Sequence, residues 1–195
     1  SAERGKAGGW IDLTTSARSP GSTLKPFIYG LAFDDGQALP DTFIEDLPAR
    51  FNTYRPENFD RNFRGMVRIS DALQHSLNVP AVLALERIGP DRFASALRLS
   101  GIDVTVYGGA EKNAGLALAL GGAGMTLRDL TRLYGALGHD GRVRTLKWIE
   151  TDVDKLTTSP MFFSSASAAE ITRILQSGPT PEGRMPARLT ADAPE

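Results

Sequence analysis

Apolar stretches with helical spacing, most of them ended by glycine or proline, are the feature that most limits the folds open to this chain. The spacing predicts helices at residues 24–33, 70–75, 79–87, 91–100, 126–137 and 165–177. Strand candidates are few and short, at residues 10–13, 104–107 and 143–153, with one more expected within 37–66. The pattern therefore predicts a mostly helical α+β fold, and 195 residues suffice for one ordinary domain.

Local signals refine the ends of these helices. Ser70 and Thr126 are the expected N-caps of two of them, with Asp129 completing a capping pair at Thr126. Residues 37–66 contain three prolines and predict a long ordered loop, whose length is unusual for a compact domain and hints at function. Residues 178–195 contain four prolines and are expected to form an irregular tail or linker.

The composition excludes several classes of function. The chain has no cysteine, which rules out disulfides, thiolate metal sites and a cysteine nucleophile. Its net charge of -1 argues against a polyanion-binding protein. No stretch reaches the roughly 20 apolar residues of a membrane span, so we expect no membrane contact from this chain itself. We expect no cofactor and no metal. A first residue other than methionine favours a piece of a longer chain.

Ser22 and Lys25 form the only S-x-x-K pattern in the chain. A serine hydroxyl needs a base to become a nucleophile, and a buried lysine with a lowered pKa can serve as one. Residues three apart on a helix share one face, with Cβ atoms roughly 5–6 Å apart. Pro26 is expected to bias Lys25 away from the α region, so that either the first turn is irregular or the regular helix starts near Lys25. Nothing marks either histidine, His75 or His139, as part of a serine–histidine–aspartate triad.

Ser76-Leu77-Asn78 lies between two predicted helices and has two interpretations. In the first, Ser76 and Asn78 point into a cleft, where a hydroxyl can relay a proton and an amide can bind a substrate backbone. In the second, the segment is a C-cap followed by an N-cap, with Asn78 capping the helix that follows. The residues alone favour the capping interpretation and leave both open.

S-x-x-K followed by S-x-N is the first part of the signature of penicillin-binding proteins and serine β-lactamases. The wording around both motifs resembles the transpeptidase domains of class A penicillin-binding proteins, closest to their 1C branch. The segments that carry the resemblance are Arg18–Gly30, Tyr54–Asp60, Gly65, Asp71–Leu73, Ser76–Val82 and Leu118–Gly122. It covers roughly residues 9–178 and implies the α+β serine transpeptidase and β-lactamase-like fold.

The resemblance also implies a role for each motif residue. Ser22 would be the nucleophile, Lys25 its base and Ser76 the proton shuttle to the leaving group, while Asn78 would bind the acyl-donor peptide. The partners implied are a peptidoglycan stem peptide ending in D-Ala-D-Ala and β-lactam antibiotics. The parent protein would be periplasmic or extracytoplasmic, anchored to the membrane through a segment not in this chain.

The third motif of that family, K-[ST]-G, is absent from the chain. The nearest string, Lys6-Ala7-Gly8, differs in residue type and precedes Ser22. The motif strand supplies part of the oxyanion hole in that family, so residues 1–195 are interpreted as a partial transpeptidase domain, incomplete at its C-terminus. Whether these residues alone are acylated stays open.

Two alternative functions follow from the same sequence. The first is a non-catalytic or β-lactam-sensing fragment of the same fold. The second is a nucleic-acid or protein-binding module, because residues 50–68 carry five arginines between aromatic residues. The near-neutral chain argues against nucleic acid. We expect instead that the aromatic side chains pin the loop to the core and that the arginines are solvated or paired.

Overall fold

The computed structural model describes residues 12–51, 54–107, 115–147 and 159–179. Within these ranges helices predominate and the strands are short, which confirms the predicted α+β class. The elements, with η for 3-10 helices, are η1 (Leu13–Thr15), η2 (Gly21–Leu24), α1 (Lys25–Asp34), β1 (Phe43–Asp46), β2 (Gly65–Arg68), α2 (Ile69–Gln74), α3 (Asn78–Ile88), α4 (Pro90–Leu99), β3 (Thr105–Val106), η3 (Leu116–Leu120), β4 (Ala123–Gly124), α5 (Leu127–Gly135), η4 (Ala136–Gly138) and α6 (Ser165–Gln176).

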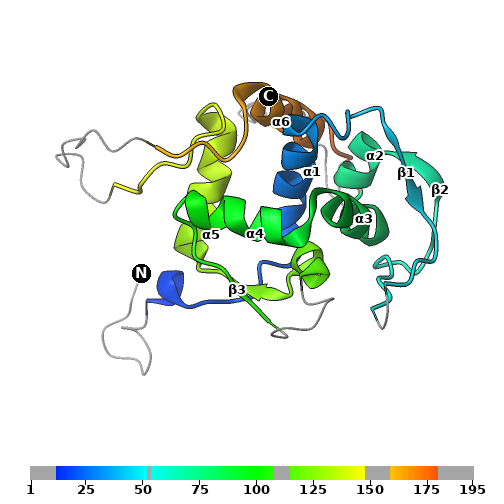
Figure 1. Ribbon diagram of the computed structural model, residues 1–195, viewed down its shortest axis with the longest axis horizontal. Helices are drawn as coiled ribbons and strands as arrows, with labels where there is room; N and C mark the ends of the chain where they lie inside the picture. The colour runs from blue at the N-terminus through cyan, green and yellow to red at the C-terminus, as the bar shows by residue number, and fades with distance from the viewer. Residues whose placement is uncertain (1–11, 52–53, 108–114, 148–158, 180–195) are drawn as a thin grey trace, which may run out of the picture.

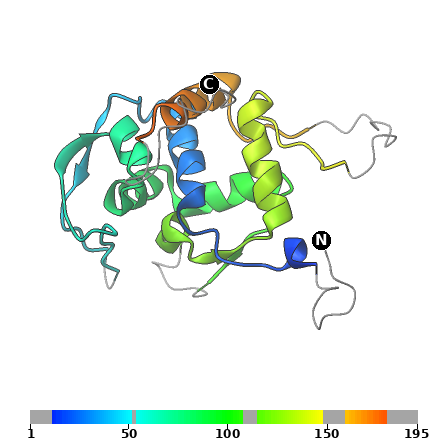
Figure 2. The same cartoon turned by 180° about the vertical axis from the view of Figure 1, so that it is seen from behind.

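Helix α1 lies at the centre of the molecule and packs against α3 and α6 (Figures 1 and 2). Every residue from Lys25 to Ala32 is buried, so the helix is enclosed on all sides. This explains why its sequence is apolar all round instead of along one stripe. Lys25 is the one charged residue in that buried run, and a buried charge requires polar partners.

Aromatic rings hold α1 in place. The Phe27 ring meets Tyr134 of α5 edge to face at a centroid distance of 5.0 Å, and it meets Phe162 at 5.7 Å. Gly30 permits the close approach of Phe163, because a Cβ atom there would lie 2.8 Å from Phe163 Cε1. Edge-to-face pairs of this kind add roughly 0.5–1.5 kcal/mol each beyond their burial. The start of α1 is therefore carried by a rigid part of the core.

The long proline-containing loop is more regular than the sequence indicates. Strands β1 and β2 lie within it and at its end, and they pair antiparallel, with Ile44 opposite Val67. Ile44 and Asp46 of β1 point inward and are buried, while Phe43 and Glu45, which alternate with them, are exposed. Strands β3 and β4 form a second antiparallel pair. The β1–β2 pair places a carboxylate, Asp46, inside the molecule.

Three local predictions are wrong. The N-cap of α2 is Arg68, not Ser70, so the helix starts at Ile69. Leu13 lies in η1 instead of a strand because the Asp12 side chain caps that turn, and residues 10 and 11 lie outside the described residues. No strand forms over residues 143–147, and the isolated bridge from Arg142 to Met161 lies just before them. The rest of that strand candidate lies outside the described residues.

The other expected helices are confirmed to within about two residues at their ends. Gly178 and Pro179 belong to no helix or strand, and the remainder of the predicted tail lies outside the described residues. None of the helices in the described part of the chain is long and apolar enough to cross a bilayer. The same residues contain no group of His, Cys, Asp and Glu side chains able to hold a metal ion.

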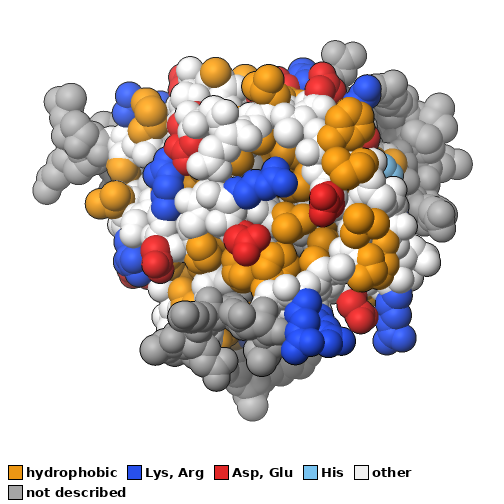
Figure 3. All heavy atoms as spheres, turned by 45° about the vertical axis from the view of Figure 1, so that its right-hand side comes forward, with side chains coloured by type: hydrophobic (Ala, Val, Ile, Leu, Met, Phe, Trp, Pro, Cys, Tyr) orange, Lys and Arg blue, Asp and Glu red, His pale blue; other side chains and the backbone are white. Residues whose placement is uncertain are grey.

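The arginine-rich loop lies on the side of the molecule that carries β1, β2 and α2, which Figure 3 brings forward with hydrophobic and basic side chains next to each other. Arg64 pairs with Asp60 at 2.9 Å, and the guanidinium of Arg68 lies over the Phe43 ring at 5.9 Å, which confirms that these two arginines are paired. Phe59 is fully exposed, so the expected pinning of the loop by its aromatic residues is wrong there.

Candidate active site

Ser22 lies in the single turn of 3-10 helix, η2, that leads into α1. Pro26 has no N–H to donate to the Ser22 carbonyl, which accepts instead from the N–H of Lys25. A 3-10 helix has three residues per turn, so the side chains of residues 22 and 25 lie one above the other. The predicted proximity of Ser22 and Lys25 thus follows from the proline.

Lys25 itself has α-helical angles, with φ -56° and ψ -43°. The expectation that Pro26 moves Lys25 out of the α region is therefore wrong. Burial of the Lys25 side chain and the packing of α1 outweigh the steric preference of a residue before proline. The predicted start of the regular helix at Lys25 is confirmed.

The turn that presents Ser22 rests on a glycine segment far along the chain. Ser19 Oγ donates to the Gly121 carbonyl oxygen at 2.7 Å. Gly121 has φ +88°, and a Cβ atom at this position would lie 2.5 Å from the Gly21 nitrogen. Only glycine fits such a position, on both conformational and steric grounds. The hydroxyl of Tyr134 supports the next residue of the turn by donating to the Thr23 carbonyl at 2.9 Å.

The Lys25 ammonium binds three oxygen atoms of the segment between α2 and α3. Lys25 Nζ donates to the Ser76 carbonyl oxygen at 2.6 Å, to Ser76 Oγ at 3.1 Å and to Asn78 Oδ1 at 2.7 Å. These bonds use all three hydrogens of the charged form. The side chain is fully buried, and no carboxylate in the described part of the chain forms an ion pair with it.

Burial lowers the pKa of Lys25 from its ordinary 10.5 to about 8. The physical cause is the loss of water around the charge, which neutral oxygen atoms replace only in part. At pH 7 a group with this pKa is neutral in about a tenth of the molecules, compared with a negligible fraction for a solvated lysine. Lys25 can therefore supply a lone pair near neutral pH.

Ser76 occupies a strained backbone position. Its φ is +51°, in the left-handed region that a non-glycine residue rarely adopts. The Leu77 N–H donates to the Ala72 carbonyl at 2.9 Å, and the Ser76 N–H donates to the Leu73 carbonyl at 3.0 Å. These two bonds define a Schellman motif at the end of α2, with serine at the position usually held by glycine. Strain of this kind, about 1 kcal/mol or more, is typical of functional sites.

Asn78 is the first residue of α3 and does not cap it. The N-cap position belongs to Leu77, whose side chain has no polar atom. The Asn78 amide instead donates to the Glu57 carbonyl at 2.6 Å and accepts from Lys25. The capping interpretation of this segment is therefore correct for the end of α2 and wrong for Asn78, whose side chain faces Lys25.

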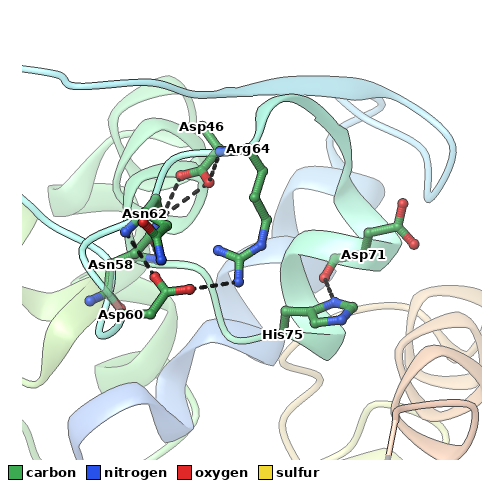
Figure 4. Close-up of polar contacts among 8 residues, drawn as sticks. Asp46, Asn58, Asp60, Asn62, Arg64, Asp71 and His75 are labelled. Carbon is green, nitrogen blue, oxygen red and sulfur yellow. Dashed lines mark hydrogen bonds and ion pairs between the residues drawn. The ribbon is translucent and has the colours of Figure 1, made fainter.

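Three of the four predicted residues, Lys25, Ser76 and Asn78, are thus joined by hydrogen bonds, and Ser22 lies one 3-10 turn before Lys25. Lys25 is buried at its centre, Ser22 and Ser76 are exposed, and Asn78 is half-buried. Among the described residues, Ser22 Oγ has no hydrogen-bond partner. His75 lies near Ser76 in the sequence, but its Nδ1 is 2.9 Å from the Asp71 carbonyl oxygen on the surface of α2 (Figure 4). The geometry therefore favours Lys25 over His75 as the partner of Ser22.

The family model of the penicillin-binding protein transpeptidase domain matches residues 6–188. The chain belongs to this family.

Known relatives and a solved structure agree with this assignment. The chain is 43% identical to penicillin-binding protein 1C of Escherichia coli (strain K12) over 180 residues, which are 91% of this chain and 23% of that protein. It is 32% identical to penicillin-binding protein 1F of Bacillus subtilis (strain 168) over 173 residues, 83% of this chain and 23% of the relative. A crystal structure of a peptidoglycan glycosyltransferase from Burkholderia ambifaria has a TM-score of 0.72, with 20% identity, and the match covers 85% of this chain and 58% of that one.

These comparisons confirm the resemblance to class A penicillin-binding proteins and the predicted fold. The chain spans 23% of the length of the two relatives, and the interpretation of residues 1–195 as a partial transpeptidase domain stays a prediction.

Several residues that shape this site belong to no catalytic motif of the sequence. Gly121 lies in the segment Leu118–Gly122 that carries the family resemblance, where the sequence assigns it no role, yet it supports the turn of Ser22. Asp46 and Asn58 carry no motif of their own, yet both are buried and linked to Asn78. The available signals are the segments around Asn58 and Gly121, whose wording resembles the transpeptidase family. Sequence spacing alone does not bring these residues to the site, because the contacts cross between separate loops.

Proposed function

We propose that this chain carries the acylation site of a D,D-transpeptidase that cross-links peptidoglycan stem peptides. Ser22 is the nucleophile, Lys25 the base, Ser76 the proton relay and Asn78 the residue that binds the acyl-donor peptide. The observation that carries the proposal is the fully buried Lys25, held by Ser76 and Asn78 one 3-10 turn from Ser22. Membership of the transpeptidase family supports the same reaction class.

In the first step, Ser22 Oγ attacks the carbonyl carbon of the penultimate D-alanine of a stem peptide. Neutral Lys25 takes the hydroxyl proton as the new C–O bond forms, since a lysine with a pKa of about 8 is an effective base near pH 7. The positive end of the η2–α1 helix favours the negative charge that develops on the carbonyl oxygen. The C–N bond to the terminal D-alanine then breaks and leaves an ester on Ser22.

Ser76 is suited to relay the proton to the departing amine. Of the three oxygen atoms around Lys25 Nζ, the Ser76 carbonyl and Asn78 Oδ1 can only accept hydrogen bonds. Ser76 Oγ can also donate, so its hydroxyl can turn and bind the lone pair of neutral Lys25. The proton can thus pass from Lys25 through Ser76 to the leaving nitrogen, which departs as a neutral amine.

Asn78 has capacity left for a substrate. Its Nδ2 donates one of two hydrogens to the Glu57 carbonyl, and its Oδ1 accepts from Lys25. The second hydrogen can donate to a backbone carbonyl of the acyl-donor peptide. Because the amide is fixed on both sides, it would hold that peptide in one orientation relative to Ser22.

In the second step, an amine of another stem peptide attacks the Ser22 ester, forms the new peptide bond and returns the hydroxyl proton to Ser22. A β-lactam would acylate Ser22 by opening its ring C–N bond, and its leaving nitrogen stays attached to the bound acyl group. Because the stem peptides belong to the cell wall, we place this activity on the outer side of the cytoplasmic membrane.

Labelling of the full-length protein by a fluorescent penicillin tests the proposal. The wild type is expected to form a covalent adduct, and Ser22→Ala is expected to form none. Thr23→Ala removes the neighbouring hydroxyl, which donates to the Pro20 carbonyl, and serves as the matched control that keeps its label. Undiminished labelling of Ser22→Ala, or no labelling of the folded wild type, would overturn the assignment of Ser22.

A further inference from the structure

Asp46 is a buried carboxylate that amide groups bind. The residue is fully buried, and none of the described arginines or lysines forms an ion pair with it. Asn58 Nδ2 donates to its two oxygens at 2.8 and 2.9 Å, and the backbone N–H of Arg64 donates to Oδ2 at 2.9 Å. The guanidinium of Arg64 turns outward to Asp60 instead (Figure 4). Asp46 therefore depends on the amide of Asn58.

That dependence fixes the orientation of Asn58. A carboxylate can only accept, so the NH2 end of the Asn58 amide must face Asp46 and the oxygen must point away. The same Nδ2 donates its other hydrogen to the Asn62 carbonyl at 2.8 Å. Asn58 Oδ1 then accepts from the backbone N–H of Asn78 at 2.8 Å. Asn58 is 4% exposed, and every polar atom of its side chain is bonded.

The bond from Asn78 to Asn58 caps helix α3 from a distant loop. The first N–H groups of a helix have no partner within the helix, and the residue at the N-cap normally supplies an acceptor. Leu77 occupies that place and cannot do so. Asn58 accepts from the first helical N–H, and the adjacent Glu57 carbonyl accepts from the Asn78 side chain. Residues 57 and 58 thus hold Asn78 by both its backbone and its amide.

We propose that Asn58, oriented by Asp46, is a positioning residue that sets Asn78 against Lys25 for acylation. The proposal rests on the function proposed above. Asn78 Oδ1 can meet Lys25 Nζ at 2.7 Å only while its amide stays turned toward Glu57 and its backbone stays bonded to Asn58. A displacement of about 1 Å in a group that positions reacting atoms can cost roughly 10²-fold in rate.

The test is an exchange of the two side chains in the full-length protein. Asn58→Asp keeps the acceptor for Asn78 but sets two carboxylates against each other, and Asp46→Asn removes the charge that orients Asn58. The double variant Asp46→Asn/Asn58→Asp restores the bond between the two side chains, since the new amide can donate to the new carboxylate while accepting from Arg64. It does not restore the donor to the Asn62 carbonyl, because a carboxylate oxygen replaces Asn58 Nδ2 there. Acylation by fluorescent penicillin is resolved into a binding constant and a first-order acylation rate constant, and unfolding midpoints are measured for each variant.

Asn58→Asp is expected to lower the acylation rate constant by roughly 10- to 100-fold, and the double variant, which restores the bond to residue 46 but not the bond to the Asn62 carbonyl, is expected to recover part of that loss. Asp60→Asn is the matched control, because it removes an exposed carboxylate of the same loop and should leave the rate unchanged. A folded Asn58→Asp that acylates like the wild type overturns the proposal. So does a double variant that regains stability relative to Asn58→Asp without regaining any of the acylation rate.

These outcomes differ from a failure of the proposed function. If Ser22→Ala still takes the label, the assignment of Ser22 falls, whatever the Asn58 variants do. If Ser22→Ala takes none and Asn58→Asp labels at the wild-type rate, Ser22 stands and only the role of Asn58 falls.

Discussion

Helices α3 and α5 begin in two different ways. At the start of α5, the side chain of the N-cap residue Thr126 caps the helix. Its hydroxyl accepts from the Asp129 N–H at 3.0 Å and donates to the Asp129 carboxylate at 2.8 Å. At the start of α3, Leu77 cannot cap and Asn58 does so from another loop. The first N–H groups of α5 are thus capped by a residue three positions away, while the first N–H of α3 is capped by a residue twenty positions away.

The difference shows what the start of α3 is used for. Its polar atoms, which would ordinarily stabilise the helix end, are bonded to Lys25, and the serine before it has a positive φ. The α5 start follows the usual rules for helix stability and makes no contact of this kind. Departures from those rules thus gather where the proposed chemistry takes place.

The largest expected effect on acylation comes from Lys25, which binds the start of α3 and not the start of α5. Lys25→Met removes the base that the α3 start binds, so we expect acylation by penicillin to fall on the order of 10³-fold. Because no carboxylate in the described ranges pairs with the buried ammonium, the variant should keep or raise the free energy of unfolding at pH 7. Stopped-flow acylation and urea unfolding measure the two quantities. If Lys25→Met is acylated at the wild-type rate, the bonds between Lys25 and the start of α3 have no role in acylation.

The second expected effect is a pH dependence of stability. Below pH 8, Lys25 is charged in both the folded and the unfolded chain; between about 8 and 10.5 it is neutral only when folded. The unfolded chain binds more protons in that range, so stability from Lys25 rises with pH, by about 3 kcal/mol in total. The measurement is the difference in unfolding free energy between the wild type and Lys25→Met.

Burial and the charge of Asp46 raise the pKa of Tyr29. Tyr29 is present in both proteins, so its titration cancels when the two unfolding free energies are subtracted. A difference that stays flat between pH 8 and 10.5 would contradict the lowered pKa of Lys25.

A smaller effect tests the strain at Ser76. Ser76→Gly relieves the positive φ and should raise the free energy of unfolding by about 1 kcal/mol. The same change removes the relay hydroxyl and should slow acylation roughly 10²-fold. Asp140, at φ +53° in an exposed turn, provides the control, since Asp140→Gly should stabilise to a similar extent without changing acylation. Equal acylation by Ser76→Gly and Asp140→Gly would show that the Ser76 hydroxyl relays no proton.

The smallest effect concerns the ordinary helix start. Thr126→Ala removes a local cap and should cost about 1 kcal/mol of unfolding free energy, measured by urea denaturation, with acylation unchanged. A slowed acylation in this variant would mean that the α5 start also acts on the site, and the comparison between the two helices would break.

The helices were largely predictable because their signals are local. Thr126 with Asp129, and the apolar run of α1, need no knowledge of the rest of the chain. The same holds for Ser22 and Lys25, whose three-residue spacing places both side chains on one face. Predictions failed where a distant group decides. Asparagine is a preferred N-cap residue, but Lys25 and Glu57 bind the Asn78 amide, and Asn58 accepts the hydrogen bond that caps the helix.

The contacts that support the turn of Ser22 could not be predicted from the sequence for the same reason. Gly121 touches the turn of Ser19 and Gly21 across one hundred residues of chain. The positive φ of Ser76 was equally hidden, since a serine after a helix indicates no left-handed residue, and only the hydrogen bonds of Leu77 and Ser76 reveal the motif.

The most direct test of the central claim is the site of acylation. The full-length protein is treated with penicillin, digested, and the modified peptide is sequenced by mass spectrometry. The account predicts a single penicilloyl group on Ser22, with Lys25→Met reaching the same product much more slowly. An adduct on Ser76 or on any other hydroxyl, with Ser22 unmodified, would contradict it.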